Sequence, residues 1–161
     1  MGIDLPERNA FLRCVERARP LLPSRPVGFC HGDYHVGNLL LGSDGELAVI
    51  DFDRSRTADP WDDHKRVVWD VEASPAFASG RIDGYFDGDV PDEFWALLAA
   101  YCASNAIGSI AWAVHFGEEQ VEHHLRQTRD IFESYNEMEH VISKWYAPSS
   151  HDMRRDIART S

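Results

Sequence analysis

The chain has 161 residues, 43% hydrophobic and 27% charged, a composition that suits one globular domain with a sizeable core. Its formal net charge of −11 argues against a nucleic-acid or anionic-membrane partner. The three cysteines lack C-x-x-C spacing, so we expect reduced thiols rather than a disulfide framework or a zinc knuckle. The first residues show no apolar signal core, and we expect a cytoplasmic protein.

The first part of the chain predicts a helix followed by a short strand. Apolar residues recur at helical spacing from about Arg8 to Arg19, and Pro20 closes that segment. A proline-containing connector comes next. The apolar run Val27–Cys30 then leads into His31, and we expect this run to be the end of a buried strand.

A β-hairpin is predicted directly after this strand. Two apolar runs, Leu39–Leu41 and Leu47–Ile50, flank an Asp-Gly turn, in which glycine accepts the positive φ that a tight turn needs. The hairpin would bring Asn38, just before its first strand, close to Asp51, just after its second. Asp33 lies in the loop immediately upstream, so three oxygen-bearing side chains are expected to converge.

The second part of the chain predicts further helices. Residues 54–60 are polar and irregular, and Asp59 as N-cap with Pro60 in the first turn opens the next helix. The segment 73–90 is broken by proline and glycine and predicts short helical turns and loops. Residues 94–115 contain no formally charged residue, as a membrane span would. Their polar residues, many alanines and lack of basic flanks favour a buried core helix.

The chain ends in one more helical region and a polar tail. Gly117 ends the long helix, and apolar residues keep helical spacing from Glu118 to Trp145. We therefore expect one domain over residues 1–148 and a polar tail over residues 149–161. The predicted fold class is α+β, mostly α, with one short hairpin on a helical body.

The spacing of polar residues around the hairpin predicts phosphoryl-transfer chemistry. Protein kinases combine a catalytic loop H-x-D-x-x-x-x-N with a metal-binding Asp in D-F-G. This chain has His31-x-Asp33-x-x-x-x-Asn38 and then D-F-D at residues 51–53. Mg²⁺ takes oxygen ligands and usually binds through one or two side chains plus substrate phosphates, which Asn38 and Asp51 fit. A carboxylate beside the metal, here Asp33, can orient a hydroxyl and accept its proton.

Three motifs in order carry a family resemblance: H-G-D-Y-H-V-G-N at 31–38, V-I-D-F-D at 49–53 and A-D-P-W-D-D at 58–63. With them the chain resembles the aminoglycoside phosphotransferase family, kinase-like enzymes that include antibiotic, choline and methylthioribose kinases. The resemblance implies the helical C-terminal lobe of a protein-kinase-like fold. It also implies transfer of the γ-phosphoryl group of ATP, with Mg²⁺, to a hydroxyl of a small molecule.

In this family the acceptor lies against the helical lobe, where acidic residues often meet cationic amino sugars. An aminoglycoside-like acceptor is therefore one expectation. The acidic candidates on the helical part of this chain are Asp83, Asp87, Asp89, Asp92, Glu93, Glu118 and Glu119.

The resemblance also implies roles for individual residues. Asp33 would be the catalytic base or hydroxyl-orienting residue, and Asn38 and Asp51 would be the Mg²⁺ ligands. Taken singly, each has an ordinary structural interpretation, as a turn, a cap or a loop residue. Taken as a spaced set that ends in an aspartate after an apolar run, they favour the phosphotransferase site.

Supporting roles are implied for five further residues. His31 and Gly32 would shape the loop, and Asp63, the last residue of the third motif, would brace it from the next helix. His35 matches a frequent histidine of the motif. The roles of His35 and Asp53 stay open, and for both residues and for Asp63 a structural role is an equal alternative.

One half of a kinase-type site has no counterpart in these residues. Such a site needs a glycine-rich loop over the phosphates and a lysine to pair with them. Upstream of His31 the only glycines are Gly2 and Gly28, there is no lysine, and no G-x-x-x-x-G-K-[ST] loop occurs anywhere. We therefore expect a C-terminal lobe without its N-terminal nucleotide lobe, which would be a partner truncated away or encoded separately, and little phosphorylation by this chain alone.

Two alternatives stay open. A metal-dependent hydrolase could use His31, Asp33 and His35 as ligands of a transition metal, which would leave Asn38 and Asp51 without a role. A non-enzymatic kinase-like remnant could bind a partner, which an exposed apolar patch beside the hairpin would support. Further ligands for the hydrolase would have to come from His64, His115, His123 or His124.

Overall fold

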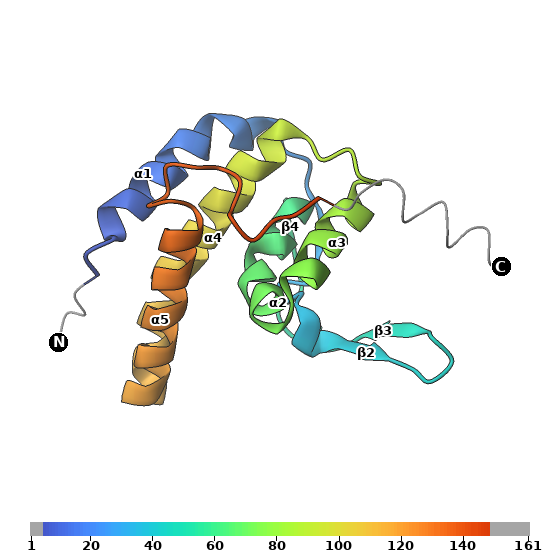
Figure 1. Ribbon diagram of the computed structural model, residues 1–161. Coiled ribbons are helices and arrows are strands. Elements are labelled where there is room, and N and C mark those ends of the chain that lie inside the picture. The colour runs from blue at the N-terminus through green and yellow to red at the C-terminus, as the bar shows by residue number, and fades with distance from the viewer. Residues whose placement is uncertain (1–4, 149–161) are drawn as a thin grey trace.

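The computed structural model describes residues 5–148, which form a mostly helical body with two small antiparallel sheets (Figure 1). The predicted mostly helical α+β class is confirmed, and the predicted tail, 149–161, lies outside the described residues. The α-helices are α1 (Arg8–Ala18), α2 (Val67–Ala73), α3 (Pro75–Tyr85), α4 (Asp92–Ala113) and α5 (Glu118–Ser134). The strands are β1 (Gly28–Cys30), β2 (Leu39–Leu41), β3 (Leu47–Val49) and β4 (Arg56–Ala58). The 3₁₀ helices are η1 (Arg19–Ser24), η2 (Val36–Asn38), η3 (Pro60–Arg66) and η4 (Val114–Phe116).

Helix α4 is the centre of the core. It packs against α1, α5 and η3, and its side chains Phe94 and Leu98 are fully buried beside Phe11 of α1. The predicted core helix is confirmed. By length and hydropathy alone, the stretch Asp92–Phe116 would also suffice to cross a membrane, and half of its most apolar part is buried inside the protein.

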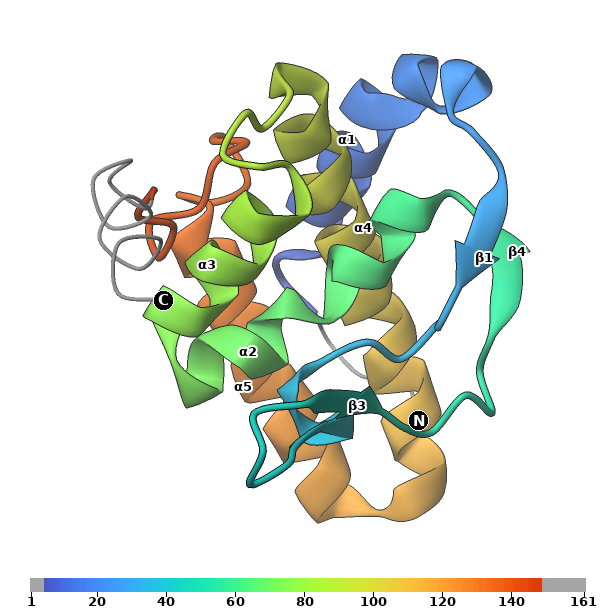
Figure 2. The same ribbon diagram turned by 90° about the vertical axis from the view of Figure 1, so that its right-hand side faces the viewer.

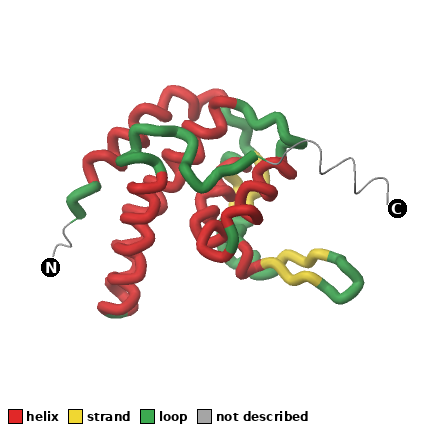
Figure 3. The backbone as a smooth tube through the Cα atoms, in the orientation of Figure 1, coloured by secondary structure: helices red, strands yellow, loops and turns green. Residues whose placement is uncertain are grey.

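The predicted hairpin is confirmed. Strands β2 and β3 pair antiparallel, and the turn between them contains Gly45 at φ 86°. The N–H of Ile50 donates to the carbonyl of Asn38 (3.0 Å), which closes the base of the hairpin. Figure 3 shows the two strands extending away from the helical body. The residues just outside the two strands are therefore held together, as the sequence predicted.

The prediction that residues 54–60 are irregular is wrong for β4. This strand pairs antiparallel with β1, with Gly28 opposite Ala58 and Cys30 opposite Arg56, and Figure 2 shows the two strands side by side at one edge of the body. Three residues are too few for an alternating pattern, so the pairing left no signal in the sequence. It ties the chain leading into the predicted catalytic loop to the chain leaving the hairpin.

The prediction of loops and short turns over residues 73–90 is also wrong, because α3 is one helix of 11 residues. Ser74 caps it by accepting a hydrogen bond from the N–H of Phe77, and Pro75 occupies the first turn, where no N–H is needed. Helix α3 contains Gly80 and Gly84, and a glycine costs a helix about 1 kcal/mol relative to alanine. Burial of Ala78 and Ile82 against the core offsets that cost.

The helical spacing predicted through Trp145 stops at Ser134. Asn136, Glu137 and Met138 all have positive φ, between 51° and 65°, which ends the helix. The side chain of Met138 is nevertheless buried in the core. An irregular segment thus supplies the apolar contacts that the spacing had suggested for a helix.

Candidate active site

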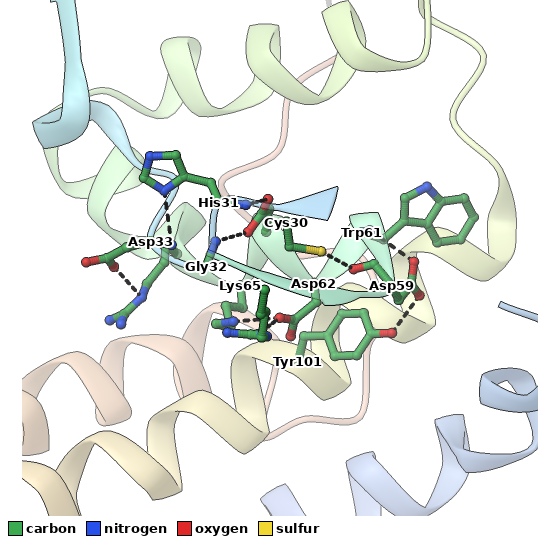
Figure 4. Close-up of polar contacts among 12 residues, drawn as sticks. Cys30, His31, Gly32, Asp33, Asp59, Trp61, Asp62, Lys65 and Tyr101 are labelled. Atoms are coloured by element: carbon green, nitrogen blue, oxygen red, sulfur yellow. Dashed lines mark hydrogen bonds and ion pairs between the residues drawn. The ribbon is translucent and has the colours of Figure 1, made fainter. Parts of the chain in front are cut away.

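The loop over residues 31–38 is fixed at its start by Asp63. The backbone N–H groups of His31 and Gly32 donate to the two carboxylate oxygens of Asp63, each at 2.7 Å (Figure 4). Asp63 comes from η3, which begins at the N-cap Asp59. One carboxylate therefore orients two successive peptide groups immediately before Asp33.

Asp59 anchors η3 to the rest of the body. Its carboxylate accepts from the N–H of Trp61 (3.0 Å), from Arg25 (2.8 and 3.0 Å) and from the hydroxyl of Tyr101 (2.7 Å). These bonds hold the pKa of Asp59 below its usual value, although burial acts in the opposite direction. The predicted N-cap is confirmed, and it fixes the helix that presents Asp63.

Gly32 stands where only glycine fits. Its φ is 82°, and a Cβ at this position would lie 2.0 Å from the backbone carbonyl oxygen of Arg54. The loop and the segment after the hairpin therefore pass each other at backbone distance.

His31 joins the loop to the hairpin. Its Nδ1 accepts the N–H of Asp33 (3.3 Å), so its Nε2 carries the proton and donates to the carbonyl of Ile50 (2.9 Å). The ring is buried against Phe52, with centroids 4.5 Å apart. Because both ring nitrogens are engaged inside the protein, His31 is a structural part of the loop rather than a metal ligand.

A buried ion pair that the sequence reasoning missed holds the middle of the loop. Asp70 of α2 accepts the N–H of Val36 (2.7 Å) and lies 2.8 Å from the guanidinium of Arg81 of α3. Arg81 also donates to the carbonyl of Tyr34 (3.1 Å). Burial raises the pKa of Asp70 and lowers that of Arg81, and each charge opposes the shift of the other. In the sequence, only the position of Asp70 among the apolar residues of α2 could have indicated this buried pair.

Asp33 lies between two arginines. Its Oδ1 is 3.0 Å from Nε of Arg66, and its Oδ2 is 3.8 Å from Nε of Arg54. The ring of His35 is 4.0 Å away, and burial is the main reason that its pKa is lowered. His35 also accepts the N–H of Gly37 (3.1 Å), which caps η2. Sequence reasoning did not identify either arginine.

Asn38 and Asp51 offer oxygen atoms at the base of the hairpin. The amide nitrogen of Asn38 donates to the backbone carbonyl of Asp33 (2.8 Å), which leaves the amide oxygen with no hydrogen bond among residues 5–148. Asp51 is exposed and has φ 64°, a conformation that aspartate tolerates better than most residues. An amide oxygen and a carboxylate are ligands that suit Mg²⁺. Asp53 is exposed, and among residues 5–148 it forms no hydrogen bond or ion pair with Asn38 or Asp51.

The transition-metal arrangement finds no support in the geometry. Residues 5–148 contain no group of three or more His, Cys, Asp or Glu side chains placed to hold a metal. His31, one of the three proposed ligands, has no free nitrogen. The hydrolase alternative is therefore set aside.

A cleft of about 390 Å³ opens beside Asp33. It is bordered by η3 and α2 on one side and by α4 and α5 on the other, with Trp69 and Trp112 among its walls. A volume of this size is in the range of small-molecule sites. A carboxylate at the edge of such a cleft can meet a hydroxyl of a bound molecule.

Comparison with known proteins identifies the family. The model of the phosphotransferase enzyme family, APH, matches residues 2–97, more than half of the chain. The chain therefore belongs to the phosphotransferase enzyme family, as the three motifs indicated. The match covers the loop, the hairpin, η3, α2 and α3 and ends inside α4. Neither the curated proteins nor the solved structures yielded a match.

Proposed function

We propose that this chain carries the catalytic half of a phosphotransferase that moves the γ-phosphoryl group of ATP to a hydroxyl of a small molecule. The observation that supports this most is the position of Asp33, at the edge of the cleft and bonded through its carbonyl to Asn38. Family membership supports the reaction class and the use of ATP.

In the proposed step, the acceptor oxygen bonds to the γ-phosphorus and the bond from that phosphorus to the β–γ bridging oxygen breaks. ADP leaves with the electron pair of the broken bond. Asp33 orients the acceptor hydroxyl and takes its proton. The guanidinium of Arg66, 3.0 Å from the Asp33 carboxylate, holds it in place. Positioning and charge neutralisation supply the catalysis, as is usual for phosphoryl transfer.

Asn38 and Asp51 are proposed to hold Mg²⁺ through the free amide oxygen and the exposed carboxylate. When bound, Mg²⁺ supplies positive charge to the nucleotide phosphates. The hydrogen bond from Asn38 to the Asp33 carbonyl couples the metal-binding residue to the proposed base.

The groups that grip the phosphates are proposed to come from outside these residues. The body is proposed to act as the C-terminal lobe of a kinase-like fold, with its hairpin and β1 facing a glycine-rich, lysine-bearing lobe. In support, β1, the hairpin and the segment directly after it expose large apolar side chains: Phe29, Leu40, Leu41, Leu47 and Phe52. Leu41 and Leu47 pair across the hairpin and so lie on one of its faces, and exposed apolar residues gathered in this way mark an interaction surface. The same observation favours the second candidate, a remnant that binds a partner without catalysis.

Metal–nucleotide binding and phosphoryl transfer distinguish the two candidates. Binding of Mn²⁺–ATP is followed by water proton relaxation, and transfer by single-turnover reactions with γ-labelled ATP. We expect the chain to bind Mn²⁺–ATP weakly and to transfer slowly, because the phosphate-gripping groups lie outside it. Asp51→Asn should weaken that binding, and Asp33→Asn should keep it while slowing the residual transfer by about 10²- to 10⁴-fold. Asp44→Asn, in the exposed turn of the hairpin, is the control. Wild-type chain that binds no Mn²⁺–ATP, or transfer unaffected by Asp33→Asn, would contradict the proposal.

A further inference from the structure

The charges that line the cleft beside Asp33 are mostly positive. Its formally charged lining residues are Asp33, Arg54 and Arg66. The two histidines in the lining, His35 and His124, both have pKa values lowered mainly by burial, so they are neutral near pH 7. None of the seven acidic candidates for binding a cationic acceptor lines the cleft. A cationic molecule would therefore meet two guanidinium groups and one carboxylate that is already paired.

The two arginines differ in how firmly they are held. Arg66 is largely withdrawn from solvent and lies 3.0 Å from Asp33. The Arg54 side chain is 51% exposed, and its Nε lies 3.8 Å from Asp33. Its guanidinium is 6.0 Å from the ring centre of Trp112, in the opposite wall of the cleft. Arg54 can therefore turn toward an anion in the cleft while Arg66 keeps Asp33 in place.

The uncharged lining suits a hydroxylated ring. Trp69 and Trp112 offer aromatic faces, on which the C–H face of a sugar can pack. Asn105 and Gln120 offer amide groups that hydrogen-bond hydroxyls, and Gly108 of α4 lines the cleft without adding a side chain. A cleft of about 390 Å³ holds a monosaccharide-sized molecule, near the lower end of typical ligand sites.

We infer that the acceptor is a compact polyhydroxylated anion, such as a sugar acid or a sugar phosphate, whose negative group binds Arg54. This inference rests on the proposed function, because it names the acceptor of that reaction. The anion-binding chemistry of Arg54 could also serve the nucleotide phosphates, and the experiment separates these two sources.

Binding of a matched set of sugars to the full chain tests the inference. Glucosamine, glucose, glucuronate and glucose 6-phosphate share one ring and differ in charge. Titrations followed by ligand-observed NMR are expected to give at least one of the two anions an affinity about tenfold above glucose, with glucosamine the weakest. Tripolyphosphate is titrated in parallel as the probe for nucleotide phosphates.

Arg54→Gln is the test variant, and Arg56→Gln is its matched control. Arg56 is an exposed arginine two positions away that does not line the cleft and pairs with Asp62 instead. Arg54→Gln should remove the preference for the anionic sugar over glucose, whereas Arg56→Gln should keep the preference.

Three results would overturn the inference. These are glucosamine binding at least as tightly as either anion, no binding of either anion, and an Arg54→Gln variant that loses affinity for tripolyphosphate but not for the anionic sugar. Phosphoryl transfer to glucosamine would refute the acceptor class and leave the phosphotransferase proposal standing. Binding of an anionic sugar through Arg54 with no detectable single-turnover transfer from ATP would keep the ligand class of the cleft and count against the phosphotransferase proposal.

Discussion

The carboxylate of Asp70 and the guanidinium of Arg81 lie 2.8 Å apart, with Asp70 completely buried. Each also binds the backbone of the loop that carries Asp33, Asp70 at Val36 and Arg81 at Tyr34. The pair therefore connects α2, α3 and the loop in one polar network inside the protein. Removal of either partner leaves a buried charge without its counterpart.

Breaking this pair is expected to be costly for folding. Arg81→Met should lower the free energy of unfolding by about 3–5 kcal/mol, because the Asp70 carboxylate stays buried without a counter-ion. A double-mutant cycle with Asp70→Asn, measured by urea unfolding, should give a coupling energy of at least about 2 kcal/mol. The control is the pair Glu16–Arg19, whose side chains are 65% and 72% exposed and whose coupling should stay below about 1 kcal/mol. Equal couplings would refute the special role of the buried pair.

Gly32→Ala is expected to be strongly destabilising. The new methyl group would lie 2.0 Å from the Arg54 carbonyl oxygen at a φ of 82°, so the backbone must move. We expect a loss of at least about 3 kcal/mol in urea unfolding. Gly80→Ala, in α3 with no atom within 4 Å of the added Cβ, should instead stabilise by about 0.5–1 kcal/mol. A similar response at the two glycines would show that the close approach at Gly32 is absent in solution.

The protein is expected to become less stable as the pH is lowered, because His64 is buried in its neutral form. Burial lowers the pKa of His64 to about 3, and its ring packs against Tyr85 and Phe94. The unfolded chain takes up this proton near pH 6.5, so the unfolded state holds more protons between the two pKa values. The stability is complete above about pH 6.5 and is lost toward pH 3, with a loss of about 2 kcal/mol at about pH 5. His64→Phe should remove that part of the pH dependence in urea titrations, and an unchanged dependence would assign it to other groups.

Asp63→Asn should loosen the start of the loop. The asparagine keeps one acceptor oxygen, which can bind the N–H of either His31 or Gly32. Its NH₂ group then faces the remaining N–H, which loses its acceptor. We expect a loss of about 1–3 kcal/mol in the free energy of unfolding. Asp44→Asn, in the exposed hairpin turn, should change it by less than about 0.5 kcal/mol. Equal stability of Asp63→Asn and the wild type would mean that the two short bonds do not form in solution.

The sequence predicted those features that depend on neighbouring residues. The hairpin followed from its Asp-Gly turn, and the cap of η3 followed from Asp59 and Pro60. The ordered motifs indicated the family that the comparison then identified, because their spacing within the loop and hairpin is itself local. The proposed roles of Asp33, Asn38 and Asp51 stay predictions that the experiments above test.

Features that depend on how distant segments dock were not predictable. Strand β4 pairs with β1 at sequence separations of 26 to 30 residues and has no pattern of its own. Arg66 ends a 3₁₀ helix and resembles a surface arginine until η3 is placed beneath the loop, where it meets Asp33. Arg81 likewise becomes part of the site only because α3 folds back against α2.

The support of the loop over residues 31–38 has a consequence for amide hydrogen exchange. The N–H groups of His31, Gly32 and Val36 donate to carboxylates of η3 and α2 rather than to a sheet. Their protons can reach solvent only when these helical elements separate from the loop, so they should exchange as slowly as amides of the core. Three backbone signals would then report, without substrate or nucleotide, whether the proposed catalytic loop is assembled.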